Sequence, residues 1–224
     1  MPRAIANWIQ LIPGYMQTLG DAQQGVPALW HKLYARHRVR ACVQMHPWNT
    51  NWSDVAEQIF RCSRNGQPPR IMLVAYSWGV GFGAVNFLRE LRRRNLHVEA
   101  AIFSDGVYHL GGQFFHRIGC SQVSAYLTRP WGRPNIRIPQ NITEVHWFTQ
   151  NRKNFELNDR MTWLRGHELV WDKDPTTNNQ TGMPLPNKTV VDGVLHRHMD
   201  ELDSFNDKVN EVANRLFRPN FIHD

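Results

Sequence analysis

Short apolar runs alternate with longer segments of helical spacing along the first half of the chain. The predicted strands are apolar and end at turn-forming residues, and they span residues 8–12, 39–45, 71–76 and 98–104. The predicted helices between them span residues 26–37, a stretch capped by Asn51 or Ser53, and residues 79–94. Strands joined by connections of helical length pair in parallel. The alternation therefore predicts an α/β three-layer sandwich, with a mostly parallel sheet and helices on both faces.

The regular alternation stops after the fourth predicted strand. Residues 107–142 are rich in Gly, Phe and Pro, and we expect them to form an insertion or cap over the carboxyl edge of the sheet. A structural excursion at the side of the domain is the alternative. The remaining predicted elements are a fifth strand at 144–149, a sixth at 168–171, a loop at 172–188 and a last helix at 203–217. With 224 residues and 42% hydrophobic content, one domain is expected to span 1–224.

The third apolar run ends at a serine that is followed at once by glycines. Ala75-x-Ser77-x-Gly79 fits a nucleophile elbow in which alanine replaces the first glycine. Such a serine sits in a strained backbone conformation, and the adjoining strand and helix leave room only for small neighbours. A chance match is the alternative. A phosphate-binding turn is disfavoured because neither the G-x-G-x-x-G spacing nor a G-K-[ST] is present.

Net charge adds one further alternative. The chain carries a formal charge of +7, part of it in the clusters at residues 36–40 and 89–94. Arginines at a helix end suit the helix dipole, so we interpret the second cluster as a solvated helix end and expect no specific nucleic acid partner. A basic nucleic-acid-associated protein is the competing interpretation, and it would show steeply salt-dependent binding.

Cysteine usage and hydropathy limit the class of protein. The three cysteines, Cys42, Cys62 and Cys120, are widely spaced and have no zinc-binding spacing, which favours a reducing compartment and no metal site. No apolar run approaches the roughly 20 residues of a membrane span. The N-terminus lacks the long apolar segment of a secretory signal. We therefore expect a cytoplasmic protein without a membrane span.

The chain resembles the α/β-hydrolase family, in its compact form without the first antiparallel strands. The residues that carry the resemblance are the Ile12-Pro13-Gly14-Tyr15 loop, the Ala75–Gly79 elbow, Asp105 at a strand end and His196 before the last helix. Ser, Asp and His follow one another in the family's order. The resemblance covers most of the chain and implies a lipase-like or esterase-like serine hydrolase.

The resemblance also implies roles for individual residues. Ser77 would be the nucleophile and His196 its base, with His198 as the alternative base. Asp105 would orient the imidazole, because the more usual family position, one strand later, offers no carboxylate until Glu156. Asp159 and Asp172 are weaker candidates for this acid, and Asp192 is a candidate for supporting the histidine loop.

The oxyanion of the tetrahedral intermediate would be bound by two backbone N–H groups, those of Trp78 and Tyr15. The implied reaction is hydrolysis of a small-molecule ester or thioester through an acyl-enzyme on Ser77, with no metal or organic cofactor. The alternative is a catalytically inactive binding protein with the same fold. The placement of His196 or His198 relative to Ser77 distinguishes the two.

Overall fold

Six parallel strands form the central sheet of the computed structural model, which describes residues 7–15, 17–18, 20, 23–63, 68–107, 135–150, 168–172 and 182–218. The order across the sheet is β2-β1-β3-β4-β6-β8, and every neighbouring pair is parallel. The strands are β1 (Asn7–Ile12), β2 (Cys42–Met45), β3 (Arg70–Tyr76), β4 (Val98–Ser104), β6 (Ile142–Gln150) and β8 (Lys188–Val191).

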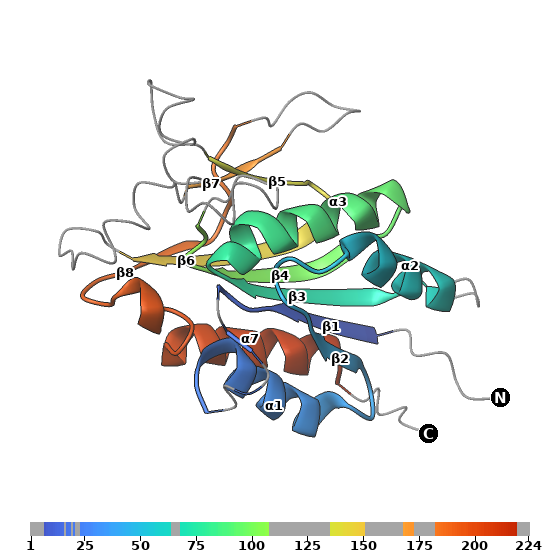
Figure 1. The fold of residues 1–224 in the computed structure, drawn as a ribbon, viewed down its shortest axis with the longest axis horizontal. Helices are drawn as coiled ribbons and strands as arrows, with labels where there is room; N and C mark the ends of the chain where they lie inside the picture. Colours follow the sequence, from blue (N-terminus) through green and yellow to red (C-terminus); the bar gives the residue numbers. More distant parts are fainter. Residues whose placement is uncertain are drawn as a thin grey trace.

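Helices cover both faces of this sheet (Figure 1). On one face lie α1 (Gly25–His37) and α7 (Asp203–Leu216). On the other lie α2 (Trp52–Ser63) and α3 (Val85–Arg93), the latter preceded by the π-helical turn η1 (Gly79–Ala84). The predicted three-layer α/β architecture is therefore confirmed.

Side chains of each central strand alternate between the two helical layers. In β1, Trp8 and Ile12 belong to the core under α2 and α3, whereas Ile9 and Leu11 belong to the core over α1 and α7. Strands that are buried on both faces are apolar along nearly their whole length; the buried polar exception in β1, Gln10, donates a hydrogen bond to Gln44. This double burial explains the continuous apolar runs that mark the strands in the sequence.

The sixth predicted strand lies outside the main sheet. Residues 169–171 form β7 (Leu169–Trp171), which pairs in parallel with β5 (Ile136–Ile138) in a separate two-stranded sheet. The apolar side chains of this pair are buried against the core on the α3 side. The main sheet is completed instead by β8, which begins within the predicted loop at 172–188. Most of β8 is exposed at the edge of the sheet, and its four residues include only two apolar ones, Val190 and Val191, so it lacks the long apolar run of the central strands.

Two further boundaries differ from the sequence predictions. The second strand begins at Cys42 rather than at residue 39, because a turn follows α1 and leaves Val39 91% exposed. The helix predicted at 79–94 starts with the wider turn η1 and ends at Arg93. Of the predicted insertion at 107–142, residues 108–134 lie outside the described residues; Val107 is buried and Ile136–Ile138 form β5.

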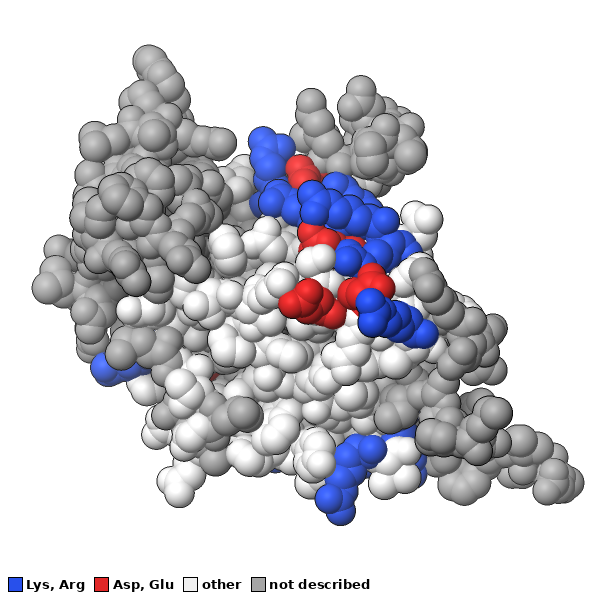
Figure 2. Space-filling view, turned by 45° about the vertical axis from the view of Figure 1, so that its right-hand side comes forward, with Lys and Arg blue, Asp and Glu red and all other residues white. Residues whose placement is uncertain are grey.

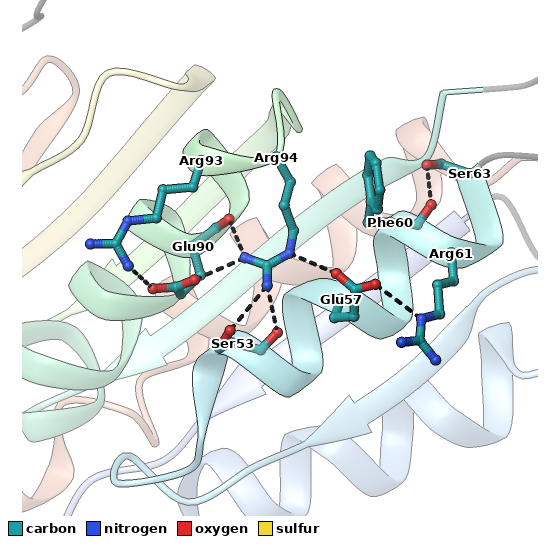
Figure 3. Close-up of polar contacts among 8 residues, drawn as sticks. All are labelled: Ser53, Glu57, Phe60, Arg61, Ser63, Glu90, Arg93 and Arg94. Carbon is teal, nitrogen blue, oxygen red and sulfur yellow. Dashed lines mark hydrogen bonds and ion pairs between the residues drawn. The ribbon is translucent and has the colours of Figure 1, made fainter.

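Arg94 connects α3 to α2 (Figure 3). Every nitrogen of its guanidinium donates a hydrogen bond: Nε to Glu57 Oε2 (3.2 Å), Nη1 to Glu90 Oε2 (2.8 Å) and Nη2 to Ser53 Oγ (3.0 Å). The backbone carbonyls of Glu90 and Ser53 accept as well. The planar guanidinium with its fixed donors is suited to joining several acceptors at once. Arg94 thus fastens two helices that also share apolar contacts.

The arginine-rich end of α3 and the neighbouring α2 carry both signs of charge. Figure 2 shows blue and red side chains side by side on this face. Arg93 pairs with Glu90, Arg61 with Glu57, and Arg89 with Asp172. The basic cluster at 89–94 is therefore interleaved with carboxylates.

Among the helices that the structure describes, none combines the length and the apolar character that crossing a bilayer requires.

We predict that Arg94→Met lowers the free energy of unfolding by about 2 kcal/mol, because it leaves partly buried carboxylate and backbone acceptors without their donor. Arg61→Met is the matched control, since Arg61 meets Glu57 with a side chain that is 74% exposed, and such pairs contribute little. Urea unfolding of both variants measures the difference. Equal midpoints for the two would contradict a fastening role for Arg94.

His37 makes stability sensitive to acid. The residue is 1% exposed, and neither ring nitrogen has a hydrogen-bond partner in the described part of the chain. Burial, together with Arg36 and Arg40 nearby, lowers the pKa of His37. The unfolded chain therefore binds this proton more readily than the folded one, and acid favours unfolding.

We predict that stability declines as the pH falls below about 6.5, the ordinary pKa of histidine. His37→Leu should reduce this dependence, because the folded state then no longer excludes a proton at this position; burial also lowers the pKa of His46, so part of the dependence remains. His31→Leu, at an exposed position of the same helix, is the control and should keep the wild-type slope. Thermal melting between pH 5 and 8 provides the measurement; identical slopes for the two variants would exclude His37 as the source.

Candidate active site

The carboxyl ends of the parallel strands bring the candidate residues to one edge of the sheet. In the sheet β2 lies on one side of β1 and β3 lies on the other. The direction in which successive strands are added therefore reverses between β1 and β3, which is a topological switch point. Open α/β sheets bind ligands at such switch points. Tyr15 follows β1, Ser77 follows β3, Asp105 follows β4 and His196 follows β8. Segments that are distant in the sequence therefore meet at this edge.

Ser77 occupies a strained turn between β3 and η1. Its φ is 55°, in the left-handed region that non-glycine residues rarely adopt. Its N–H donates to the carbonyl of Ser104 (3.1 Å), while its own carbonyl accepts from the N–H groups of Val80 and Gly81 (both 3.1 Å). Hydrogen bonds on both sides of the residue thus hold the turn, and the strained conformation expected from the sequence is present.

Glycines allow the backbone to pack closely around this turn. A Cβ atom on Gly79 would lie 2.2 Å from the carbonyl oxygen of Ile12, and one on Gly14 would lie 2.9 Å from the Tyr76 ring and 3.1 Å from Ser77 Cβ. Neither position has room for a side chain. The absence of a Cβ at Gly14 brings the loop after β1 against the serine.

Ser77, His196 and Asp105 form a continuous chain of hydrogen bonds. Ser77 Oγ lies 2.8 Å from His196 Nε2, and His196 Nδ1 lies 2.6 Å from Asp105 Oδ2. An ionised carboxylate can only accept, so Nδ1 donates to Asp105 and Nε2 accepts from the serine hydroxyl. This tautomer leaves the nitrogen beside Ser77 free to take a proton. The arrangement has the geometry of a nucleophile, a base and a group that orients the base.

Asp105 is fully buried, and the neighbouring strand supplies its other partners. Gln150, at the end of β6, donates through Nε2 to Asp105 Oδ2 at 3.0 Å. The hydroxyl of Thr149 lies 3.4 Å from Oδ1. The sequence shows that this strand end lacks a carboxylate, but no pattern in it predicts a role for Gln150. The parallel register between β4 and β6, which sequence patterns do not specify, is what places the amide there.

The segment that carries His196 is attached to the sheet at two points. The hydroxyl of Tyr76 donates to the His196 carbonyl at 2.6 Å, and its ring stacks on the imidazole with centroids 5.1 Å apart. Ser104 Oγ donates to the carbonyl of Met199 at 2.8 Å. Both contacts come from the ends of β3 and β4, and they fix the imidazole above the serine.

The alternative candidates lie apart from this chain of hydrogen bonds. His198 is half-exposed and pairs with Glu201, Nδ1 lying 3.1 Å from Oε2. Asp172 lies 3.7 Å from an Arg89 nitrogen, and Asp192 is exposed in the loop after β8. Asp159 lies outside the described residues. Of the two histidines and the described acids, the structure brings only His196 and Asp105 to Ser77.

The rings of Tyr15 and Trp78 lie against each other. Their ring centroids are 4.3 Å apart, and Trp78 also meets the edge of Trp48 at 5.1 Å. Tyr15 is 50% exposed, whereas the other two rings are buried. Tyr15 is therefore the exposed ring of an otherwise buried aromatic group that includes the residue after Ser77. No cluster of three or more His, Cys, Asp or Glu side chains in the described part of the chain has an arrangement that could hold a metal ion.

No family model and no curated protein sequence matches this chain. Solved structures with a similar backbone include the type II thioesterase BorB from the borrelidin biosynthetic cluster, at 14% identity and a TM-score of 0.43, covering 93% of both chains. The RedJ thioesterase from the prodiginine pathway of Streptomyces coelicolor has 13% identity and a TM-score of 0.43, covering 96% of this chain and 88% of its own. The alpha/beta hydrolase domain-containing protein 10 from mouse has 10% identity and a TM-score of 0.40, covering 93% and 90%.

At these identities and TM-scores the matches carry no argument about what this chain does. The class of fold follows from the chain itself. A parallel sheet covered on both faces by helices, with a strained serine turn after a central strand, has the architecture of the α/β-hydrolase fold. This agrees with the family resemblance noted in the sequence.

We predict that Gly79→Ala lowers the free energy of unfolding by about 3 kcal/mol, because the added methyl group must displace the backbone of Ile12. Gly20→Ala is the control, since among the described residues its Cβ would meet only the hydroxyl of Thr18, at 3.5 Å. Urea denaturation compares the two variants. A Gly79→Ala protein as stable as Gly20→Ala would show that the turn accommodates a methyl group at position 79.

Proposed function

We propose that this protein is a serine hydrolase that cleaves an ester or thioester through an acyl-enzyme on Ser77. The observation that supports the proposal is the unbroken hydrogen-bonded chain from Ser77 Oγ through His196 to Asp105, with distances of 2.8 and 2.6 Å. A serine hydroxyl is a weak nucleophile at neutral pH and requires an adjacent base. His196 is positioned to be that base.

The reaction begins when Ser77 Oγ attacks the substrate carbonyl while His196 Nε2 takes the hydroxyl proton. The carboxylate of Asp105 stabilises the imidazolium that forms. The backbone N–H groups of Trp78 and Tyr15 bind the oxyanion of the tetrahedral intermediate. His196 then protonates the leaving alcohol or thiol, and the acyl group remains on Ser77.

In hydrolysis of the acyl-enzyme, water takes the part of the nucleophile and Ser77 Oγ becomes the leaving group. A water molecule gives one proton to His196 Nε2 and attacks the acyl carbon. Collapse of the second tetrahedral intermediate breaks the Ser77 ester, and His196 returns the proton to Ser77 Oγ. The products are a carboxylic acid and the free enzyme. No step requires a metal or an organic cofactor.

The aromatic group beside Ser77, which is exposed at Tyr15, favours a substrate with an apolar acyl or alcohol part. Tyr15, Trp78 and Trp48 form one contiguous group of rings next to the nucleophile. Aromatic side chains offer large apolar contact areas with little loss of conformational freedom. We therefore propose acyl esters and acyl thioesters as the first substrates to test.

We predict that Ser77→Ala and His196→Ala each lower kcat by at least about 10³-fold, because each removes a group that acts only in bond making and breaking. His198→Ala is the matched control and should keep wild-type turnover. The measurement is hydrolysis of p-nitrophenyl esters and acyl thioesters of several chain lengths, together with labelling by a fluorophosphonate probe.

Two results would refute the proposal. One is turnover by Ser77→Ala at the wild-type rate, which would place the chemistry elsewhere. The other is a folded wild-type protein that neither turns over these substrates nor labels with the probe. That second outcome would favour the alternative of an inactive binding protein.

A further inference from the structure

Asp200 is a second fully buried carboxylate near the proposed site, and the mechanism above does not use it. Its Oδ2 accepts hydrogen bonds from Gln17 Nε2 at 2.7 Å and from the N–H of Val26 at 3.0 Å. Its Oδ1 has no hydrogen-bond partner in the described part of the chain. Burial raises the pKa of this carboxyl, against the effect of its hydrogen-bond donors. A buried carboxylate is costly, so its contacts call for a physical explanation.

Gln17 links Asp200 to the loop after β1. While its Nε2 donates to Asp200, its Oε1 accepts from the N–H of Gly14 at 3.0 Å. Its own N–H donates to the Gly14 carbonyl at 3.4 Å. Both backbone polar groups of Gly14 are therefore bound to Gln17. The next residue is Tyr15, whose N–H is one of the two proposed oxyanion donors.

Asp200 also belongs to the segment that carries the proposed base. It lies four residues after His196 in the sequence. Tyr76 and Ser104 anchor the carbonyls of His196 and Met199, at 2.6 and 2.8 Å respectively. One end of this anchored segment presents the imidazole, and the other presents the carboxylate that holds Gln17. The loop after β1 is thus hydrogen-bonded, through Gln17, to the same anchored segment that carries the proposed base.

We propose that Asp200 and Gln17 are positioning residues that hold the Gly14–Tyr15 backbone at a fixed position relative to His196. The inference rests on the proposed function, because it assigns the pair to the oxyanion side of that site. Oxyanion donors act on charge that develops in the transition state. Loosening this loop should therefore lower kcat and leave KM nearly unchanged.

A purely structural role is the competing explanation. The Asp200 carboxylate accepts from Val26, in the first turn of α1, where the N-cap residue Gln24 makes no side-chain hydrogen bond. Acceptors at this position stabilise a helix start. Gln17 separates the two roles, because replacing it breaks the link to Gly14 and leaves the contact between Asp200 and Val26 in place.

The experiment compares kcat and KM for Gln17→Leu, Asp200→Ala, Asp200→Asn and the double variant Gln17→Leu/Asp200→Ala on the best ester or thioester substrate. We expect each single loss of the link to lower kcat about 10-fold to 100-fold, less than removal of an oxyanion donor outright, with KM within about twofold. Asp200→Asn keeps an acceptor oxygen and should retain most of the activity. The double variant should be no worse than the poorer single variant, because both changes break one link.

Gln58→Leu and Asp207→Ala are matched controls at exposed helical positions and should keep wild-type kcat. Wild-type kcat in Gln17→Leu would overturn the inference. So would a double variant whose loss equals the product of the two single losses. If Asp200→Ala does not fold, Gln17→Leu alone decides the outcome.

Parallel assays of Ser77→Ala separate this inference from the proposed function. An inactive Ser77→Ala beside fully active Gln17→Leu and Asp200→Ala removes only the positioning role. Wild-type turnover in Ser77→Ala, or a wild-type protein without turnover or labelling, removes the hydrolase proposal and this inference together.

Discussion

The backbone of Ser77 is held in a left-handed conformation by hydrogen bonds on both sides, and the rest of the site is arranged around that turn. Its N–H is bound to the carbonyl of Ser104, and its carbonyl receives N–H groups from the following helical turn. The conformation is unfavourable for a residue with a side chain, so interactions with the surrounding backbone must stabilise it. Gly79 and Gly14 make that possible, since a side chain at either position would collide with the neighbouring chain.

The sheet converts this local turn into a site. Parallel strands end at the same edge, so the turn after β3 lies beside the turns after β1 and β4. The segment after β8 then crosses to the serine and is held there by Tyr76 and Ser104. The apolar layers on both faces keep the strands in place, while hydrogen bonds at the edge set the distances between the polar groups. Architecture and chemistry are therefore carried by different kinds of interaction.

Two buried carboxylates frame the proposed base, and their surroundings differ. Asp105 is met by His196, Gln150 and Thr149, so both of its oxygens have polar neighbours. Among the described residues Asp200 has donors on one oxygen only, and burial raises the pKa of this carboxyl. In the proposed mechanism the first stabilises charge on the imidazole. In the proposed positioning role the second acts through Gln17 on the backbone of Gly14, so the loop after β1 is linked to the segment that carries His196.

Local pattern was sufficient for most of the architecture, because strands buried on both faces are almost continuously apolar and the helices between them present an apolar stripe. It also singled out Ser77, since a strained turn between a strand and a helix tolerates only small neighbours such as Ala75 and Gly79. The edge strand β8 gave no such signal, and the apolar segment that became β7 was buried by packing rather than by joining the main sheet.

The choice between His196 and His198, and the partners Gln150, Gln17 and Asp200, were decided only by tertiary structure. Two histidines in one loop have the same chemistry. In the structure Tyr76 anchors the His196 carbonyl and the His196 ring meets the serine, whereas the His198 ring pairs with Glu201. Hydrogen bonds between residues as far apart as Gln17 and Asp200 depend on register and distance across the fold, and no periodicity along the chain encodes them.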